Sequence, residues 1–495
     1  MFPIKGRITK RMFYRLKDDI ALRAWKGISH ACYRKQRPEA EPLKDQEFEI
    51  LQKCDGLHDL PEDPENGPEL SVIRILLQKG MIEPCVRGQE PSRWSRFREY
   101  DNLYYPKMNI MITGKCNFNC LHCFNAADNA PLMTQWEFED IQDLLDQAED
   151  CGIHAFTITG GEPMVHPRFM DILREIYKRD MIVEELNTNG SFIRQEVLDE
   201  MRSFDCEPVI KISFDGVGFH DWMRNRKGVE KETLSAMQLC LDNGFKVMSQ
   251  TQVNRKNLDA MMPTARLLND MGIGEMRIIR TTEVNRWSSN AGDASLPVEE
   301  YYEKLLQFAS EYRESGMNML IDIWQLIRLN PHRKEYMLVP VLYPDGEYHF
   351  LMPCCKGTRG MIGVTSAGDI IPCLQISGTY EKQGVHLGNL HETPLKELIT
   401  DSPYTDVVCS TLGGLALANE TCGQCPYFKW CAGGCRALGM LLSWEKADTM
   451  GTDYTKCVFF KNGWYEKSVR AMEGWKLMTP AKGVEALHAE GKGKG

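Results

Sequence analysis

The pattern of hydrophobic and polar positions changes near residue 101. Beyond that point, short apolar runs alternate with stretches in which apolar residues recur every three or four positions, as strands alternate with amphipathic helices. Alternation of this kind is typical of a mostly parallel sheet and predicts an α/β fold. The apolar runs lie at 108–113, 154–159, 182–187, 209–214, 246–251 and 275–281. Six such units predict an incomplete (β/α)6 barrel.

Before residue 101 the pattern favours a small helical unit. Apolar spacing predicts one helix over 48–56, closed by an Asp-Gly pair, and a second over 70–82, ending at Gly80. Two helices this close together, with little else that is regular, predict a winged-helix-like domain in residues 1–100. No helix rich in Arg, Asn or Gln is visible there, which argues against reading of DNA bases.

Composition and charge exclude several classes of protein. A chain of 495 residues divides into two to four domains, and its net charge of -10 provides no general basic surface for nucleic acid. Residues 1–37 carry 11 Lys or Arg, and residues 38–70 carry 11 acidic residues. These opposite charges could form two complementary surfaces of one domain or a surface that binds a partner, and the sequence supports both explanations equally. No apolar run is long enough for a membrane span or a signal peptide, so we expect a cytoplasmic protein.

Three cysteines follow the first apolar run at C-x3-C-x2-C spacing, as Cys116, Cys120 and Cys123. Three thiolates this close can bind three irons of a 4Fe-4S cube and leave the fourth iron without a protein ligand. The alternative is a structural zinc site, which needs a fourth ligand, and His122 inside the loop is the only nearby candidate. The ligand count favours the cluster.

Polar residues and glycines gather where the predicted strands end. In parallel α/β barrels the chemistry lies at the C-terminal ends of the strands, so these residues are candidates for a binding site. Each polar residue alone is explained equally well by a turn or a helix cap, but the set together indicates a ligand pocket. The candidates are Gly160, Gly161, Glu162, Pro163, Asn187, Ser213, Asp215 and, on the segment that follows, Arg224.

The cysteine loop together with the Gly-Gly-Glu-Pro turn at 160–163 resembles the radical S-adenosylmethionine (SAM) superfamily. The resemblance implies that the open iron chelates the amino and carboxylate groups of SAM, and that one electron cleaves SAM to a 5′-deoxyadenosyl radical. It also implies that His122 packs on the adenine, that the turn binds the SAM amino group, and that the strand end at 213–215 holds the carboxylate and ribose with help from Arg224. Asn187 is assigned to the same cofactor pocket.

A second set of cysteines lies between residues 354 and 457. The spacing is C-x12-G-x4-C from Cys355 through Gly368, then C-x2-C-x5-C-x3-C-x21-C, and zinc knuckles are the alternative for the second half alone. In a long chain without a signal peptide, so many cysteines indicate metal or redox work rather than disulfides. The members are Cys354, Cys355, Cys373, Cys422, Cys425, Cys431, Cys435 and Cys457.

This spacing resembles the SPASM extension of radical SAM enzymes, which implies two auxiliary 4Fe-4S clusters. The resemblance assigns the distal cluster to Cys422, Cys425, Cys431 and Cys457, and the proximal cluster to Cys355, Cys373 and Cys435. A further cysteine that some relatives carry is missing from 356–363, so either Cys354 completes the proximal shell or one iron stays open. An open iron could bind a substrate thiolate, because soft sulfur suits iron.

Residues 1–100 resemble the leader-recognition domain of enzymes that modify ribosomally made peptides, which bind an extended leader at a sheet edge. The resemblance therefore predicts an enzyme that forms a thioether or carbon-carbon crosslink in a ribosomal precursor peptide, with an external electron donor such as flavodoxin or ferredoxin. The expected domains are a recognition domain (1–100), a barrel (101–335), a SPASM domain (336–475) and a disordered tail (476–495).

Two alternatives stay open. Anaerobic sulfatase maturases, which oxidise Cys or Ser, carry an Asp base directly after the cysteine of the G-x4-C element, where this chain has Leu374. A non-catalytic iron-sulfur electron carrier would need no SAM pocket, so the strand-end residues argue against it.

Overall fold

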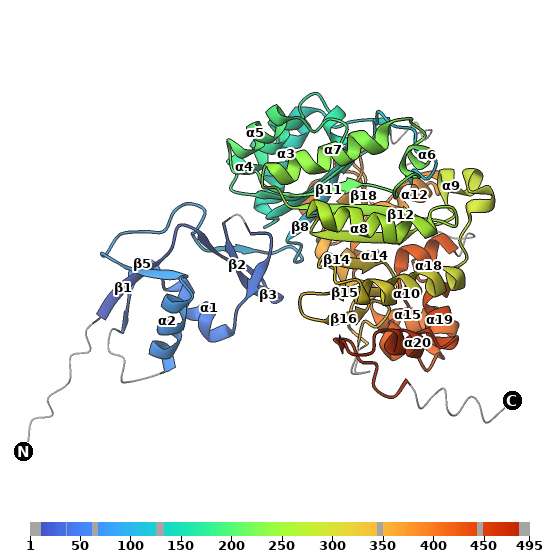
Figure 1. Ribbon diagram of the computed structural model, residues 1–495. Coiled ribbons are helices and arrows are strands. Elements are labelled where there is room, and N and C mark those ends of the chain that lie inside the picture. Colours follow the sequence, from blue (N-terminus) through green and yellow to red (C-terminus); the bar gives the residue numbers. More distant parts are fainter. Residues whose placement is uncertain are drawn as a thin grey trace, which may run out of the picture.

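A sheet of 12 strands runs through the molecule and carries the candidate site (Figure 1). The computed structural model describes residues 11–35, 37–61, 68–124, 133–343, 350–442 and 449–484. The centre of the sheet is a run of six parallel strands, β8 (Lys107–Thr113), β9 (Ala155–Gly160), β10 (Ile182–Thr188), β11 (Val209–Ser213), β12 (Val247–Val253) and β13 (Glu275–Arg280). The six predicted runs coincide with these strands, which confirms the incomplete barrel.

Amphipathic helices cover the outer face of the barrel. In α4 (Phe169–Lys178), Phe169, Ile172, Leu173 and Ile176 are buried on one face, and each large side chain removed from water contributes about 1.5–3 kcal/mol. The other helices of this layer are α3 (Phe138–Asp150), α5 (Gln195–Arg202), α7 (Val229–Asp242), α8 (Met261–Met271) and α10 (Val298–Glu314). The short helices α6 (His220–Arg224) and α9 (Asn285–Asn290) pack against each other beside the cysteine loop.

The C-terminal part of the chain extends the same sheet at both edges. Strand β17 (Met361–Val364) pairs with β8 in parallel and is followed by β18 (Ile370–Ile371), while β14 (Leu320–Ile323), β15 (Ile327–Asn330), β16 (Glu335–Leu338) and β19 (Lys476–Leu477) continue from β13. The domain boundary expected near 335 therefore falls inside the sheet. The tail expected to be disordered from 476 is ordered up to 484, because β19 pairs with β16, and residues 485–495 lie outside the described residues.

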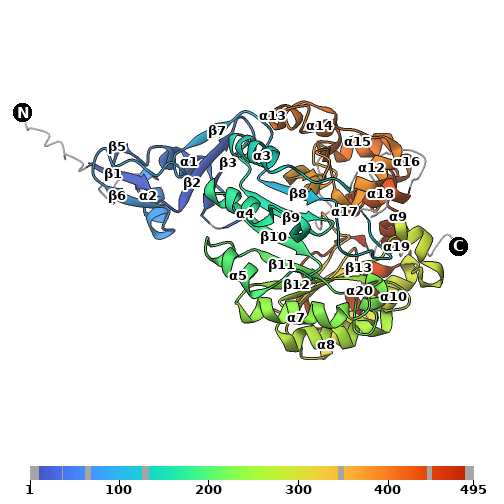
Figure 2. The same cartoon turned by 90° about the horizontal axis from the view of Figure 1, so that it is seen from above.

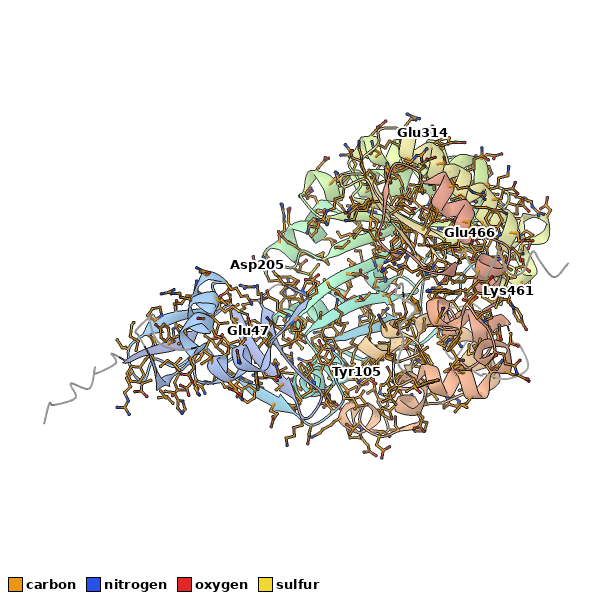
Figure 3. All side chains as sticks on the ribbon, turned by 90° about the horizontal axis from the view of Figure 1, so that it is seen from below. Glu47, Tyr105, Asp205, Glu314, Lys461 and Glu466 are labelled. Carbon is orange, nitrogen blue, oxygen red and sulfur yellow. The ribbon has the colours of Figure 1, made fainter. Side chains whose placement is uncertain are left out.

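Short helices make up most of the C-terminal region and carry the second set of cysteines. Tyr105, labelled in Figure 3, packs against this region from the start of the barrel, 6.2 Å from the ring of Tyr404. The helices are α11 (Lys356–Gly360), α12 (Ser377–Gln383), α13 (Leu395–Leu398), α14 (Pro403–Val408), α15 (Leu412–Ala418), α16 (Glu420–Gly423), α17 (Phe428–Cys431), α18 (Arg436–Leu442), α19 (Tyr454–Lys461) and α20 (Trp464–Ala471).

The N-terminal unit projects from one side of the molecule (Figures 1 and 2). It holds a three-stranded antiparallel sheet of β5 (Asp55–Pro61), β1 (Arg11–Leu16) and β6 (Ile82–Cys85), beside helices α1 (Asp45–Gln52) and α2 (Pro68–Gln78). A second sheet contains β2 (Ile20–Trp25), β3 (Ser29–Arg34), β4 (Ala40–Pro42) and β7 (Arg98–Tyr100). The winged-helix-like domain stays a prediction.

One predicted helix of this unit is shorter than expected. The helix expected over 48–56 ends at Gln52, and Asp55 and Gly56 begin strand β5 instead. Gly56 has a φ of +78°, and a Cβ there would lie 2.2 Å from the carbonyl oxygen of Gln89, so the chain needs glycine to turn here. The second helix is present and is followed by Gly80 with a φ of +66°. Glu47, labelled in Figure 3, accepts from Lys79 at 2.7 Å and ties the two helices together.

The N-terminal unit contacts the end of the barrel at which strands begin. Arg98 pairs with Glu149 at the end of α3 (2.8 Å), and Lys35 pairs with Asp180 just before β10 (2.7 Å). His154, just before β9, donates to the Arg37 carbonyl oxygen (3.0 Å). The unit therefore docks opposite the strand ends at which the site is predicted.

Candidate functional site

A cavity of about 330 Å³ lies at the C-terminal ends of the central strands. Most of the residues predicted from the sequence line it, although they come from separate strands and loops. They are Cys116, Cys120, His122, Cys123, Gly160, Gly161, Asn187, Ser213 and Arg224. The predicted residues Glu162, Pro163 and Asp215 do not line the cavity.

The Gly-Gly pair at the end of β9 holds the cysteine loop against the barrel. Gly161 donates its N–H to Thr113 (2.8 Å), and Glu162 donates its N–H to Lys115 (2.9 Å). A Cβ at Gly160 would lie 2.3 Å from the Thr113 oxygen, and a Cβ at Gly161 would lie 2.4 Å from the Lys115 oxygen. Only glycine allows this approach, so the pair places the loop as well as lining the cavity.

Glu162 lies behind the cavity wall, and its predicted contact with the cofactor stays a prediction. Its carboxylate is fully buried and accepts from the Thr188 hydroxyl (2.8 Å), the Asn189 N–H (2.7 Å) and the Met164 N–H (3.3 Å). Burial raises the pKa of Glu162 to about 7, although these three donors favour the charged form. Glu162 thus ties the end of β9 to the end of β10. Pro163, buried beside it, begins the turn that follows.

Asp215 also lies behind the wall and positions Arg224, and its predicted contact with the cofactor stays a prediction. Asp215 Oδ2 lies 2.7 Å from Arg224 Nε as an ion pair, and Asp215 Oδ1 accepts a hydrogen bond from Arg224 Nη2 (3.1 Å). Arg224 Nη1 donates to the Cys120 sulfur (3.7 Å). Burial acts to raise the pKa of Asp215, but the Arg224 charge together with His220 and His122 holds that pKa below its usual value. The pair fixes a cation beside the cysteine loop.

Two histidines near this pair are neutral. His220 Nδ1 accepts from the Asp215 N–H (3.0 Å), so its contact with the Asp215 carboxylate is not an ion pair, and burial lowers the pKa of His220. Burial also lowers the pKa of His122 to about 4. His122 Nδ1 is buried without a hydrogen-bond partner, as is Asn109 Oδ1, and both residues line the cavity. Unpaired buried polar atoms on a cavity wall are what a bound polar ligand would satisfy.

Asn189 is a site residue that the sequence analysis missed. Its side chain donates to Asn117 (2.9 Å) and approaches the Cys116 sulfur (3.9 Å), while its own N–H holds Glu162. Asn187 and Asn189 both stand at the end of a predicted strand, so the sequence gives no reason to separate them. Both line the cavity, but only Asn189 also forms hydrogen bonds to the cysteine loop.

The second wall of the cavity comes from the C-terminal region. Leu374 and Gln375, which follow Cys373, face the cysteine loop together with Leu438 and Leu441 of α18. Thr134 donates to the Ser366 carbonyl oxygen (2.9 Å), which joins the two regions next to the cavity. Thr134 therefore does not cap α3, as its Thr-x-x-Glu pattern would suggest, and that helix begins after Glu137.

The auxiliary cysteines fall into two groups. Burial raises the pKa of Cys435 to about 12, and the nearby charges of Asp453, Cys373 and Cys355 add to this effect. In the same way, burial raises the pKa of Cys431 to about 12, with Cys425 and Cys422 close enough to contribute. Cys457 lies near Cys422 and Cys425. These neighbourhoods match the proximal and distal ligand sets that the resemblance implies.

Cys354 lies between the two groups. It is buried in one apolar cluster with Cys422 and Leu412, against which Cys425 also packs, and the charge of the neighbouring Cys355 affects its pKa. Whether Cys354 completes the proximal shell stays a prediction.

The donor atoms suit iron-sulfur clusters better than single metal ions. All 18 cysteines are free thiols. Within the described ranges, no three His, Cys, Asp or Glu side chains converge closely enough to hold one metal ion, as zinc would require. Three thiols on one loop, with hydrogen bonds to two of the sulfurs, fit a cube whose irons are spread over several ångströms.

Searches against known families and structures agree with this site. Residues 110–268 match the Radical SAM superfamily, and residues 354–426 match SPASM, an iron-sulfur cluster-binding domain. The antilisterial bacteriocin subtilosin biosynthesis protein AlbA of Bacillus subtilis is 28% identical over 414 residues, which are 81% of this chain and 84% of that protein. The AdoMet-dependent heme synthase of Methanosarcina barkeri is 24% identical over 331 residues, which are 66% of this chain and 89% of that protein.

The fold is also known from solved structures. The crystal structure of Streptococcus suis SuiB bound to precursor peptide SuiA has a TM-score of 0.61 at 14% identity and covers 90% of this chain and 100% of that chain. Coverage this high includes part of residues 1–100. In the described part of the chain, no helix has the length and apolar character needed to cross a membrane. The chain is therefore an enzyme that contains a radical SAM domain at residues 110–268 and a SPASM iron-sulfur cluster-binding domain at residues 354–426.

Proposed function

We propose that this enzyme crosslinks a ribosomally made precursor peptide. The observation that carries the proposal is the shared cavity, which has the SAM-cluster cysteines on one wall and the residues after Cys373 on the other. A peptide side chain held there would lie between the site of hydrogen abstraction and the proximal cysteines. The bacteriocin biosynthesis protein AlbA and the peptide-bound SuiB support a peptide substrate.

SAM, bound to the cluster of Cys116, Cys120 and Cys123, would supply a 5′-deoxyadenosyl radical that abstracts hydrogen. The chain's own residues aim this chemistry. Gly160 and Gly161 fix the loop, and Arg224 places a positive charge at Cys120. Ser213 and Asn187 offer polar atoms to the cofactor at the strand ends. Apolar side chains on the opposite wall keep water away from the reacting carbon.

The cavity contains no evident enzyme base. Among the described lining residues there is no Asp, Glu, Lys or Tyr, and burial keeps the only histidine neutral with a low pKa. The position used as a base in sulfatase maturases is Leu374, which cannot accept a proton. Cys355, Cys373 and Cys435 would hold an auxiliary cluster, and a peptide thiol bound to it would need no enzyme base, because metal binding would release the thiol proton to solvent. The carbon that lost its hydrogen would then bond to that sulfur, and the auxiliary clusters would accept the remaining electron. We therefore favour a thioether over oxidation to formylglycine.

The test is the intact mass of the short peptide encoded beside the gene, after anaerobic co-expression with the enzyme. Loss of two hydrogens per crosslink, located by fragmentation, supports the proposal. The matched control is the enzyme with Cys116, Cys120 and Cys123 changed to Ala, which should return an unmodified peptide. An unchanged mass with the wild-type enzyme, while SAM cleavage proceeds, would refute crosslinking of that peptide.

Electrons for SAM cleavage would come from an external donor such as flavodoxin or ferredoxin. Replacing the chemical reductant by each protein in turn, and measuring 5′-deoxyadenosine, identifies the donor. A leader-free peptide tests the N-terminal unit in the same assay. If residues 1–100 recognise the leader, the truncated peptide should be modified much more slowly than the full precursor.

A further inference from the structure

The charge on the cavity wall is not balanced. The described lining residues include two cations, Arg224 and Arg280, and no carboxylate. Arg224 is neutralised by Asp215 behind the wall. Arg280, at the end of β13, forms no ion pair within the described residues, and its Nη1 donates a hydrogen bond to the Leu296 carbonyl oxygen (2.9 Å). The cavity therefore presents one unneutralised guanidinium.

A guanidinium in this position is suited to an anion. It carries five N–H donors in a planar fork, and the Leu296 oxygen holds one end in place. The side chain is half-buried. A half-buried charge is costly without a counter-ion, and a planar carboxylate supplies both the charge and the matching geometry.

The cavity wall around Arg280 is partly apolar and extends toward the C-terminal region. Ile279, Val284 and Trp324 line the cavity, as do the polar residues Thr281, Thr282 and Gln252, and Leu374, Leu438 and Leu441 line the opposite wall. The apolar side chains can accommodate the aliphatic stem of a residue and reduce the water around a charge pair, which strengthens that pair.

We propose that Arg280 binds a carboxylate of the peptide substrate, from an Asp or Glu side chain or the C-terminus, beside the carbon that loses hydrogen. The inference rests on the proposed function and deepens it, because it names the chemical class of substrate residue. The other available carboxylate is that of SAM. The resemblance assigns SAM to the cysteine loop and Arg224, so the experiment must distinguish these two sources.

The first arm measures the cofactor. Arg280→Gln and Arg280→Lys enzymes, with clusters reconstituted, are titrated with SAM, and 5′-deoxyadenosine is measured without peptide. Arg255→Gln is the matched control, because Arg255 is exposed and pairs with Glu300 at the surface. All three variants should keep wild-type SAM affinity and cleavage. A loss of about tenfold or more in SAM affinity, confined to the Arg280 variants, would overturn the proposal, since a charge-assisted bond is worth that factor.

The second arm needs no natural peptide. Equilibrium dialysis compares N-acetylglutamate α-amide with N-acetylglutamine α-amide on the SAM-loaded enzyme. The acid should bind about tenfold or more tightly than the amide, and Arg280→Gln should abolish the preference. The Arg280→Lys enzyme should keep part of the preference for the acid, because lysine retains the positive charge but lacks the planar set of guanidinium N–H donors. Equal binding of acid and amide by the wild-type enzyme would overturn the proposal.

The third arm uses the precursor peptide. Each acidic residue is changed to its amide, and the crosslinked fraction is measured by mass. Substitution of one acidic peptide residue should lower the crosslinked fraction with the wild-type enzyme. The same peptide substitution should lower the crosslinked fraction little further with the Arg280→Gln enzyme, as expected for two groups that act as a pair. If the wild-type enzyme modifies no peptide at all, the proposed function fails, whereas the dialysis result still decides on Arg280.

Discussion

Replacing Gly161 by Ala should remove the SAM cluster while leaving the rest of the protein folded. The added Cβ would lie 2.4 Å from the Lys115 oxygen and 2.5 Å from the Gly114 oxygen. Both are backbone atoms, so no side chain can rotate away. The two segments must separate, although the Gly161 and Glu162 N–H groups bond them together at 2.8 and 2.9 Å.

The magnitude follows from these contacts. Overpacking of this kind costs about 1–3 kcal/mol, and weakening two hydrogen bonds adds roughly 0.5–1.5 kcal/mol each. The total of roughly 2–6 kcal/mol should destabilise the conformation of the loop that holds Cys116, because this loop would be displaced from the end of β9. The auxiliary cysteines lie on another part of the chain and should keep their iron.

The assay is iron and sulfide content per protein, with SAM cleavage as the functional readout. Gly161→Ala should lose one cluster's share of iron and should cleave no SAM. Gly274→Ala is the matched control, because its nearest neighbour, the Val247 oxygen, lies 3.6 Å from the added Cβ. If Gly161→Ala keeps the same iron content and SAM cleavage as Gly274→Ala, the assignment of Gly161 as the support of the cysteine loop is wrong.

Three further predictions concern other parts of the structure. Asp215→Ala should destabilise the fold by about 3–5 kcal/mol, because it leaves Arg224 buried and unpaired, and a urea unfolding midpoint close to wild type would contradict this. Burial lowers the pKa of His154 to about 4, so the unfolded chain binds more protons below its own pKa of 6.5, and stability should fall as pH drops from about 6.5 to 4. His154→Asn should flatten this part of the stability profile by up to about 3 kcal/mol, and an unchanged slope would count against the neutral, buried histidine. Cys354→Ser should keep full iron content whereas Cys435→Ser loses the proximal cluster, and equal losses would show that Cys354 is a ligand after all.

The barrel could be predicted because its strands are short runs rich in apolar residues. Runs such as 108–113 and 209–214 are interrupted by few polar residues and are separated by helices with a different period, so the local sequence predicts them. The N-terminal strands were missed for a related reason. β2 is buried along its whole length but contains Arg23, whose charge is satisfied by the carbonyl oxygens of Trp94 and Arg96 from far along the chain. A charged residue interrupts the apolar pattern unless those distant partners are known.

The candidate site shows the same limit. Cysteine spacing predicts the ligands of the clusters, because cluster binding requires particular donors at short separations. The roles of Glu162 and Asp215 depend instead on hydrogen bonds to residues on neighbouring strands. Arg280 and Leu441 reach one cavity only through the tertiary fold, so no local pattern could mark them as neighbours.

The pairing of β17 with β8 sets an order for making this protein. β8 is the first barrel strand to leave the ribosome, but one of its two neighbours is β17, which begins at Met361. Until then β8 has an open edge, and an unpaired edge strand invites association with other chains. Pairings so distant in sequence also form slowly, because a long loop must close first. The nascent chain therefore depends on protection until its cluster-binding C-terminal region is complete, which couples correct assembly of the barrel to synthesis of nearly the whole chain.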